Sequence, residues 1–303
     1  MWGDIAIAFL LAFITAYVVT PYTIRFAHKI GAVDVPRDSR RVHAKTTPRL
    51  GGLAVIAGFI VSTFYLFAIM SIEQGLTLID SNNYHIQLIG FFTGILILTI
   101  FCFIDDKRGI PPLVKLLGQT LAAIAVTYSG VRIDQIFATT FGGTITSELL
   151  SFIITVIWIV GITNAINLID GLDGLSSGIG IISCISLLII FALNESSVIA
   201  IILITALAGS LLGFIPFNFN SAKTFLGDTG SNFLGYCLAV ISIIGIAKTY
   251  TAVVVIAPLI IFAIPLLDTS FAIIRRIIKT RSFKGVFQGD KGHLHHKILM
   301  ARL

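Results

Sequence analysis

The chain has 303 residues, of which 56% are hydrophobic and only 12% are charged. Since soluble domains carry about 25% charged residues, this composition excludes an ordinary soluble globular protein and predicts an integral membrane protein. The formal net charge of +6 then bears on how the loops face the two sides of the membrane.

Nine segments free of charged residues have, or nearly have, the roughly 20 residues that a helix needs to cross a bilayer. They are residues 5–24, 50–72, 81–104, 116–131, 149–169, 174–194, 196–222, 229–247 and 249–267. The fourth is short, but Lys115 can extend it back to Pro112 if its side chain reaches toward the interface. None alternates as a β-barrel strand does. We therefore predict an all-α polytopic helical bundle of about nine transmembrane helices, with one domain over 1–303.

Lysine and arginine are distributed unequally between the two sides of this bundle. Nineteen of the 21 basic residues fall on one side, and only Arg132 and Lys248 fall on the other. That side comprises the loops 25–49, 105–115, 170–173 and 220–228 and the tail from residue 275, and all of these except 170–173 contain basic residues. Because basic loops stay in the cytoplasm, we predict that this side is cytoplasmic and that the N-terminus is outside.

Five polar clusters interrupt the apolar pattern, and all of them fall on the predicted cytoplasmic side. In chain order they are Lys45–Arg49, Asp105–Asp106, Asn167 with Asp170 and Asp173, Asn218 to Asp228, and His293 with His295 and His296. Ionisable groups beside a membrane span are costly unless they are paired, solvated or used. Their gathering on one face predicts an active site there.

The adjacent acids Asp105 and Asp106 follow the third apolar segment. On a helix their side chains diverge by roughly 100°, so both need not bind one ion. One interpretation is a divalent-cation or acid–base cluster. The other is a solvated helix end, with Lys107 and Arg108 as partners.

Asn167, Asp170 and Asp173 share one face if their segment is helical. Each aspartate is followed by glycine, which lets the backbone approach a ligand closely. The alternative is a tight turn without a ligand, in which the aspartates bond to nearby backbone groups.

Gly227-Asp228-Thr-Gly-Ser231 opens the eighth apolar segment. A helix N-terminus favours anions, and a carboxylate there can hold Mg²⁺ against a diphosphate, since Mg²⁺ takes one or two carboxylates plus waters and phosphates. Asp228 can equally be only a helix N-cap.

The remaining clusters carry hydrogen-bond donors. His293, His295 and His296 lack the further ligands of a tetrahedral zinc site, so they suit phosphate binding or an amphipathic tail at the membrane surface. The residues of Lys45–Arg49 bind phosphate or only enforce topology.

Together these motifs resemble the polyprenyl-phosphate N-acetylhexosamine-1-phosphate transferases, glycosyltransferase family 4. The shared markers, in this order, are Thr47-Pro-Arg-Leu-Gly-Gly52, Asp105-Asp106, Asn167-x-x-Asp-Gly-x-Asp-Gly, Asn218 ten residues before Asp228, and the histidines. The resemblance covers nearly the whole chain. It implies a Mg²⁺-dependent phosphoglycosyltransferase in which a lipid phosphate attacks the β-phosphorus of a UDP-amino sugar and releases UMP.

The resemblance also implies roles for individual residues. Asp228 matches the Mg²⁺ ligand, with Asn167 placed beside the metal, and Asp105 and Asp106 match the catalytic acidic pair. The positions implied to bind the donor are Asp170, Asp173, Asn218, Phe225 and Lys45. The positions implied to bind phosphate are His293, His295, His296, Thr47 and Arg49. Mn²⁺ is the alternative ion.

The histidine motif indicates the branch of the family. His293-Leu-His-His resembles the N-acetylglucosamine-1-phosphate branch, whereas the phospho-N-acetylmuramoyl-pentapeptide transferases of peptidoglycan synthesis carry a contiguous triplet. We therefore predict transfer of N-acetylglucosamine 1-phosphate from UDP-N-acetylglucosamine to undecaprenyl phosphate, as the first membrane step of a cell-wall glycopolymer such as teichoic acid. The peptidoglycan enzyme stays the alternative.

Two other classes fit less well. A transporter needs acids near the bilayer midplane, often in broken helices, whereas these acids lie at one face. A CDP-alcohol phosphotransferase also uses Asp-Gly motifs, but here Asp173-Gly174 is followed by Leu-Ser-Ser-Gly.

The resemblance places the protein in the bacterial plasma membrane as a multi-pass enzyme with cytoplasmic catalytic loops. The implied partners are a UDP-amino sugar, undecaprenyl phosphate and membrane lipid, without nucleic acid; the sequence leaves a homodimer open. Family members continue past the histidines into further helices, so we expect this chain to be truncated after the loop 289–297.

Overall fold

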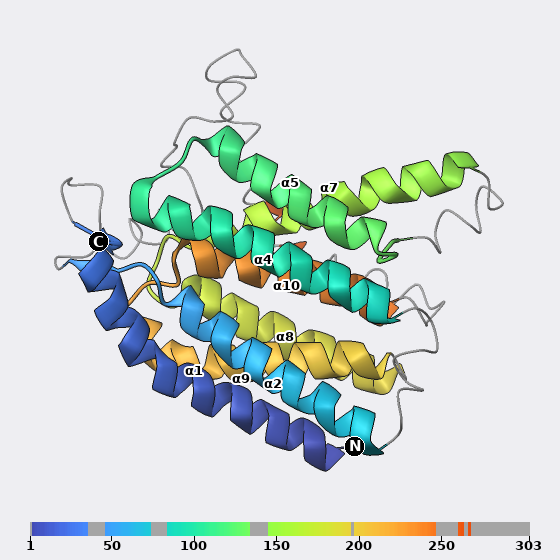
Figure 1. Cartoon of the computed structure of the whole chain (residues 1–303), viewed down its shortest axis with the longest axis horizontal. Helices are drawn as coiled ribbons and strands as arrows, with labels where there is room; N and C mark the ends of the chain where they lie inside the picture. The colour runs from blue at the N-terminus through green and yellow to red at the C-terminus, as the bar shows by residue number, and fades with distance from the viewer. Residues whose placement is uncertain are drawn as a thin grey trace.

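Eight long α-helices and one short β-ladder make up the part of the chain that the computed structural model describes (Figure 1). That part comprises residues 2–35, 46–73, 84–133, 145–194, 197–246, 260–263 and 266–267. The helices are α1 (Trp2–Ile30), α2 (Gly52–Glu73), α4 (Tyr84–Arg108), α5 (Pro112–Tyr128), α7 (Ile145–Ile169), α8 (Leu175–Leu193), α9 (Val198–Asn218) and α10 (Gly227–Ile246).

These helices coincide with the first eight apolar segments of the sequence. By length and composition, six of the described helices can cross a membrane, which confirms a mostly helical, multi-pass protein. Helix α5 is shorter, with 17 residues, and begins at Pro112 as expected. The ninth predicted segment, 249–267, lies almost entirely outside the described residues. The count of nine, the single domain over 1–303 and the orientation in the membrane stay predictions.

Local sequence explains where several helices begin and end. A helix is the favoured form of an apolar span because its backbone groups bond internally. Pro111 and Pro112 start α5, since proline is pre-shaped for the first turn and lacks an N–H that the turn would leave unbonded. Helix α4 ends at Arg108, and the left-handed conformation of Gly109, with φ +69°, is a common helix terminator.

Helix α10 lies at the centre of the bundle. It contacts α2, α4, α7, α8 and α9, and most of its residues are buried. Helix α9 is similarly enclosed by α1, α2 and α8. Its Gly213 allows a close approach to α1, because a Cβ there would lie 2.2 Å from the Phe13 carbonyl oxygen; small residues serve this purpose between membrane helices. The helix that carries Asp228 is thus held from several sides.

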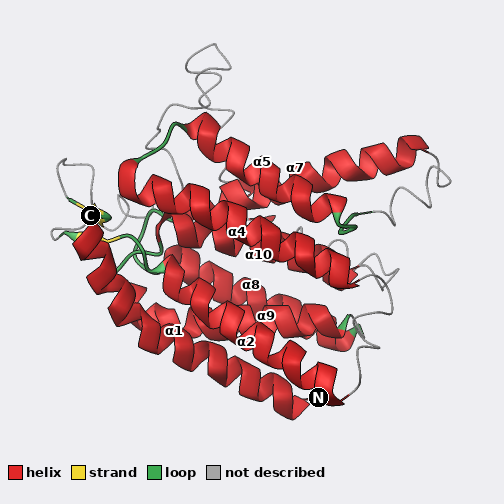
Figure 2. Ribbon diagram, viewed as in Figure 1, coloured by secondary structure: helices red, strands yellow, loops and turns green. Residues whose placement is uncertain are grey.

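The polar loops gather at one end of the bundle, on the left in Figure 2. There β1 (Val33–Asp34) pairs with β2 (Thr47–Pro48) in an antiparallel ladder. Strands of two residues are too short for the alternation that predicts a strand from sequence, and the ladder was not predicted. The described clusters therefore lie at the same end of the molecule.

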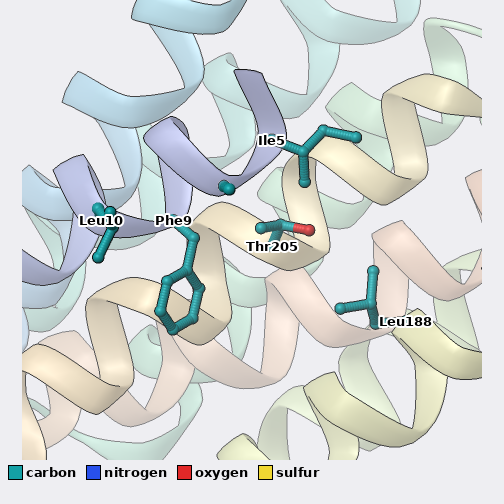
Figure 3. A pocket seen from close by; sticks show the side chains of 6 residues that line it. Ile5, Phe9, Leu10, Leu188 and Thr205 are labelled. Atoms are coloured by element: carbon teal, nitrogen blue, oxygen red, sulfur yellow. The ribbon is translucent and has the colours of Figure 1, made fainter. Parts of the chain in front are cut away.

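An apolar hollow of about 490 Å³ lies between α1, α8 and α9 (Figure 3). Its walls are Ile5, Ala6, Phe9, Leu10, Leu188 and Thr205. None of these side chains is charged, and those of α1 belong to its N-terminal part, away from the loop end. The hollow is therefore separate from the polar clusters.

Candidate active site

Side chains from several helices meet around Asp228, which belongs to the first turn of α10. Asn167, near the end of α7, donates from Nδ2 to Asp228 Oδ1 at 2.8 Å and to Ser231 Oγ at 2.7 Å. Lys115, near the start of α5, donates from Nζ to the same Asp228 oxygen. We call Lys115, Asn167 and Asp228 the Asp228 triad. The structure thus brings together the two residues that the resemblance assigned to the metal, and adds a lysine.

Lys115 is the cation of this cluster. Its Nζ also lies 3.3 Å from Asp105 Oδ2, and only 16% of its side chain is exposed. The Lys115 side chain is thus directed to two carboxylates at the loop end of the bundle. Carboxylates inside a protein attract a cation, because the low dielectric strengthens the attraction and makes an unpaired charge costly. The signal that could have identified it is one lysine, ten residues after Asp105, in an otherwise apolar helix.

Asp106 caps α10 from a different helix. Its Oδ1 accepts the N–H of Asp228 at 2.8 Å, and its Oδ2 accepts the N–H of Thr229 at 2.8 Å and the Thr229 hydroxyl at 2.6 Å. Asp106 is only 6% exposed. A carboxylate in this place satisfies free N–H groups and faces the positive end of the helix dipole. The sequence suggested Asp228 as the N-cap, but Asp106 supplies the capping carboxylate.

Asp105 faces a different direction from its neighbour. Its Oδ1 accepts the N–H of Ile110 at 2.8 Å, and its Oδ2 faces Lys115. Lys107 and Arg108, which the sequence offered as partners for the acids, are exposed. The divergence of adjacent side chains on a helix therefore separates the pair: one acid holds the start of α10 and the other lies beside the Asp228 triad.

The segment from Asn167 to Gly174 is a helix end followed by a turn. Helix α7 ends and α8 begins within or just after it, and Gly174 has φ +71°. Asn167 consequently faces Asp228, whereas Asp173 Oδ2 accepts the N–H of Ala222 at 3.0 Å. The continuous helical face considered from the sequence does not form, because glycine favours a break in the helix.

Asp170 lies in the turn between α7 and α8. Desolvation by the surrounding protein, followed by the negative charges of Asp228 and Asp106, raises the pKa of Asp170 to about 8. A cation bound nearby would favour the ionised carboxylate and lower that pKa. Near neutral pH, the charge on Asp170 therefore depends on whether a cation is close.

Asn218 ends α9 and organises the loop that leads to Asp228. The Ser177 hydroxyl donates to its Oδ1 at 2.8 Å, and its Nδ2 donates to the Thr224 carbonyl at 3.1 Å. Asn218 is 3% exposed. The Asn218 amide therefore holds the loop between α9 and α10 from within.

Phe225 joins the same loop to the segment before α2. Its N–H donates to the Pro48 carbonyl at 2.8 Å, and its carbonyl accepts the N–H of Gly51 at 3.0 Å. Gly227 follows with φ +74°, and a Cβ there would lie 1.8 Å from the Arg49 carbonyl oxygen. Only glycine fits this close approach. The Phe225 side chain is half-buried, beside the residues that hold Asp228.

Thr47 and Arg49 lie on either side of Pro48. Thr47 is 4% exposed in β2. Arg49 Nη2 lies 3.4 Å from Asp34 Oδ2, with 37% of the arginine side chain exposed. Because a guanidinium has five N–H donors, pairing with Asp34 leaves Arg49 donors for a further anion.

Four residues that the resemblance assigned to the site lie outside the described residues. They are Lys45, His293, His295 and His296. Their assignments stay predictions.

The oxygen-rich cluster suits a hard divalent cation. Within the described ranges, no group of three His, Cys, Asp or Glu side chains forms a ready-made metal site. Mg²⁺ does not require one, because it usually takes one or two carboxylates with waters and substrate phosphates. The Lys115 ammonium, placed between Asp105 and Asp228, shows that this position favours positive charge. The residues therefore fit Mg²⁺ with Asp228 as the main ligand.

Comparison with known proteins identifies relatives along almost the whole chain. Residues 88–246 match the family profile described as Glycosyl transferase family 4. A probable undecaprenyl-phosphate N-acetylglucosaminyl 1-phosphate transferase of Bacillus subtilis (strain 168) is 38% identical over an alignment of 299 positions that covers 97% of this chain and 77% of the relative. The decaprenyl-phosphate N-acetylglucosaminephosphotransferase of Mycobacterium tuberculosis (strain ATCC 25618 / H37Rv) is 34% identical, over 98% of this chain and 76% of the relative.

A relative with lower identity is named for the alternative activity, that of the peptidoglycan enzyme. The phospho-N-acetylmuramoyl-pentapeptide-transferase of Bacillus cytotoxicus is 32% identical over an alignment of 301 positions that covers 95% of this chain and 87% of the relative. The segment matched by the family profile contains the Asp228 triad, both acids of α4 and the loop from Asn218 to Phe225.

Proposed function

Because the chain belongs to glycosyl transferase family 4, we propose that it transfers N-acetylglucosamine 1-phosphate from UDP-N-acetylglucosamine to undecaprenyl phosphate. An oxygen of the lipid phosphate bonds to the β-phosphorus of the donor, and the bond between that phosphorus and the bridging oxygen breaks. UMP leaves with the bridging oxygen, and the other product is undecaprenyl-diphosphate-N-acetylglucosamine. The higher identity to a relative named for this activity supports it over the pentapeptide reaction.

One observation carries the proposal: the Asp228 triad and Asp105 meet at the loop end of a membrane-spanning bundle. Phosphoryl transfer depends mostly on positioning and on neutralising charge. A lysine, an amide and two carboxylates provide both signs of charge, so they can hold a cation and a diphosphate together. The same end suits a lipid acceptor whose tail remains in the bilayer.

Asp228 and Asn167 are the residues that would hold Mg²⁺, or Mn²⁺ as the alternative. The bound ion would screen the diphosphate and stabilise the leaving UMP. Lys115, relieved of its pairing with Asp228, would donate to a phosphate oxygen as a charge-assisted hydrogen bond. Asp105 would remain beside Lys115 and keep its ammonium oriented.

The acceptor needs little activation, because a phosphate monoester has a second pKa near 6 and is largely dianionic at neutral pH. We assign Asp105 the role of base for the remaining monoanion, since it borders the Asp228 triad. Asp106 acts instead on the position of Asp228, because both of its oxygens bond to the start of α10.

The remaining assignments of the resemblance are retained as part of this proposal. Asp173 and Asn218 support the loop that carries Phe225 toward the nucleotide, and Asp170 is close enough to Asp228 and Asp106 to be affected by their charges. The proposed residues for the donor and its phosphates also include Lys45, Thr47, Arg49, His293, His295 and His296.

We also propose that the loop end faces the cytoplasm of a bacterial cell and that the N-terminus lies outside. The unequal distribution of the 21 basic residues, 19 of which fall on one side when the predicted spans are counted, supports this orientation. A cytoplasmic site can take a soluble nucleotide sugar directly, and the product would start a cell-wall glycopolymer such as teichoic acid.

The purified full-length protein should release UMP from UDP-N-acetylglucosamine only when undecaprenyl phosphate and Mg²⁺ are both present. Chromatography of the nucleotide and mass spectrometry of the lipid product measure the reaction. A chelator should stop UMP release, and Mg²⁺ or Mn²⁺ should restore it, because the diphosphate needs a cation.

A panel of donors distinguishes the candidate functions. Faster turnover with UDP-N-acetylmuramoyl-pentapeptide would replace the proposal by the peptidoglycan reaction. Absence of UMP with every UDP-amino sugar would refute the proposed enzymatic function and favour the alternative of a membrane transporter.

Asp170→Asn and Asp173→Asn should each raise the KM for the UDP-sugar roughly tenfold, because each loses a charged acceptor worth about 1.5–3 kcal/mol. The Mg²⁺ concentration for half-maximal rate should change less than the KM for the donor does, since neither residue is the proposed main ligand. Steady-state kinetics with varied donor and varied Mg²⁺ separate the effects. Equal losses in both would contradict the separation of nucleotide and metal roles.

A further inference from the structure

Three neutral amides, two of them buried and Asn164 partly buried, form a cluster beneath the Asp228 triad. Gln119 of α5 donates from Nε2 to Asn232 Oδ1 at 2.6 Å and to Asn164 Oδ1 at 3.3 Å. Asn164 of α7 donates from Nδ2 to Gln119 Oε1 at 2.6 Å. Asn232 of α10 donates from Nδ2 to the Asp228 carbonyl at 2.8 Å. We call Gln119, Asn164 and Asn232 the amide triad.

The amide triad is fully bonded, since each of its oxygen and nitrogen atoms has a partner among the described residues. Gln119 and Asn232 are 1% and 0% exposed. Uncharged amides both donate and accept, so they link helices without placing a charge inside the protein. The cluster therefore specifies how three helices fit together.

Each amide lies one helical turn deeper than one member of the Asp228 triad. Gln119 follows Lys115 by four residues, Asn164 precedes Asn167 by three, and Asn232 follows Asp228 by four. Residues three or four apart share a helix face. The two triads thus join the same three helices at two successive levels, and the lower level sets the rotation and separation of the upper one.

Stability alone does not explain this cluster. Polar groups inside membrane spans are costly and usually functional, and replacing both partners of a buried hydrogen bond by apolar groups of the same shape can be nearly neutral for stability. A polar network does restrict which arrangement the helices adopt. Misplacing a reacting group by about 1 Å can cost roughly 100-fold in rate. A network that restricts the arrangement of α5, α7 and α10 one turn below the Asp228 triad therefore affects the reaction rate.

We propose that Gln119, Asn164 and Asn232 are positioning residues for phosphoryl transfer. They hold the Asp228 triad in register, so that the lysine and the carboxylate face the same diphosphate. This inference rests on the function proposed above, and it adds residues that touch neither the substrates nor the cation.

The test replaces the whole amide triad by apolar residues of similar shape: Gln119→Met, Asn164→Leu and Asn232→Leu together. No amide partner is then left unbonded, so the protein should fold, because removal of both sides of a hydrogen bond is nearly neutral. The kcat per folded molecule should fall roughly 10- to 100-fold. The KM for the donor should stay within about threefold, as expected when only transition-state contacts are lost.

A second variant keeps the test decisive if the triple variant fails to fold. Exchanging the two amides, with Gln119→Asn and Asn232→Gln, preserves their combined length and their hydrogen-bonding groups. The exchange should recover at least about threefold in kcat over either single change, because neighbouring partners couple. The matched control is Gln87→Met, which removes an amide that donates to the Gly130 carbonyl at the opposite end and should leave kcat unchanged.

The outcomes separate this inference from the function on which it rests. A folded triple variant with wild-type kcat would overturn the positioning role, and so would an exchange variant that is no better than the two single changes. A wild-type protein that releases no UMP would overturn the proposed function and the inference with it.

Discussion

Replacing Asp228 with asparagine should lower the kcat for UMP release roughly 1,000-fold, because the change removes the charge that holds a divalent cation against the diphosphate. The side chain keeps its shape, and Asn167 can still donate to its oxygen. Lys115 retains Asp105 as a counter-charge at 3.3 Å, so the variant should remain folded. The measurement is kcat over a range of Mg²⁺ concentrations, with circular dichroism as the check of folding.

A matched control removes a carboxylate that lies far from the cluster. Glu148 is exposed in the first turn of α7, at the opposite end of that helix from Asn167. Glu148→Gln should therefore leave kcat and the Mg²⁺ requirement unchanged. Survival of turnover in Asp228→Asn, with the wild-type Mg²⁺ requirement, would show that another residue holds the ion.

Asp106→Asn should lower both thermal stability and activity. The two oxygens of Asp106 accept three hydrogen bonds from the start of α10. An amide keeps one oxygen and presents an NH₂ group to a donor, so the change should cost about 1–3 kcal/mol in the free energy of unfolding. Asp228 is itself one of the bonded residues. We therefore expect kcat to fall roughly 100-fold through its displacement.

Asp105→Asn is the matched comparison, since it alters the adjacent acid and leaves the α10 cap in place. It should lower kcat, because Lys115 loses a charged partner, with a smaller decrease in unfolding temperature than Asp106→Asn. Thermal unfolding of the detergent-solubilised variants, followed by fluorescence, gives the comparison. Equal unfolding temperatures for the two variants would refute the capping role of Asp106.

Much of the architecture was predictable from the sequence. Uninterrupted apolar segments indicate helices, because a membrane span must bond its own backbone, and eight of the predicted segments are helices in the described part. The same-side placement of Asp105, Asn167 and Asp228 followed from counting spans. The family followed from motif order and is supported by the 38% identity to a named relative. Lys45 and the histidines stay predictions.

The sequence by itself therefore determined the helices, the shared end of the polar clusters and the family. Only the tertiary structure decided which contacts each polar side chain makes. Lys115 bonds to Asp228, and Asp106 caps α10 while Asp105 does not. Three amides bond to one another beneath the Asp228 triad. The physical reason is helix rotation. Helices apolar on every side give no periodic signal of which face turns inward. Only packing among helices far apart in the sequence establishes which side chains meet.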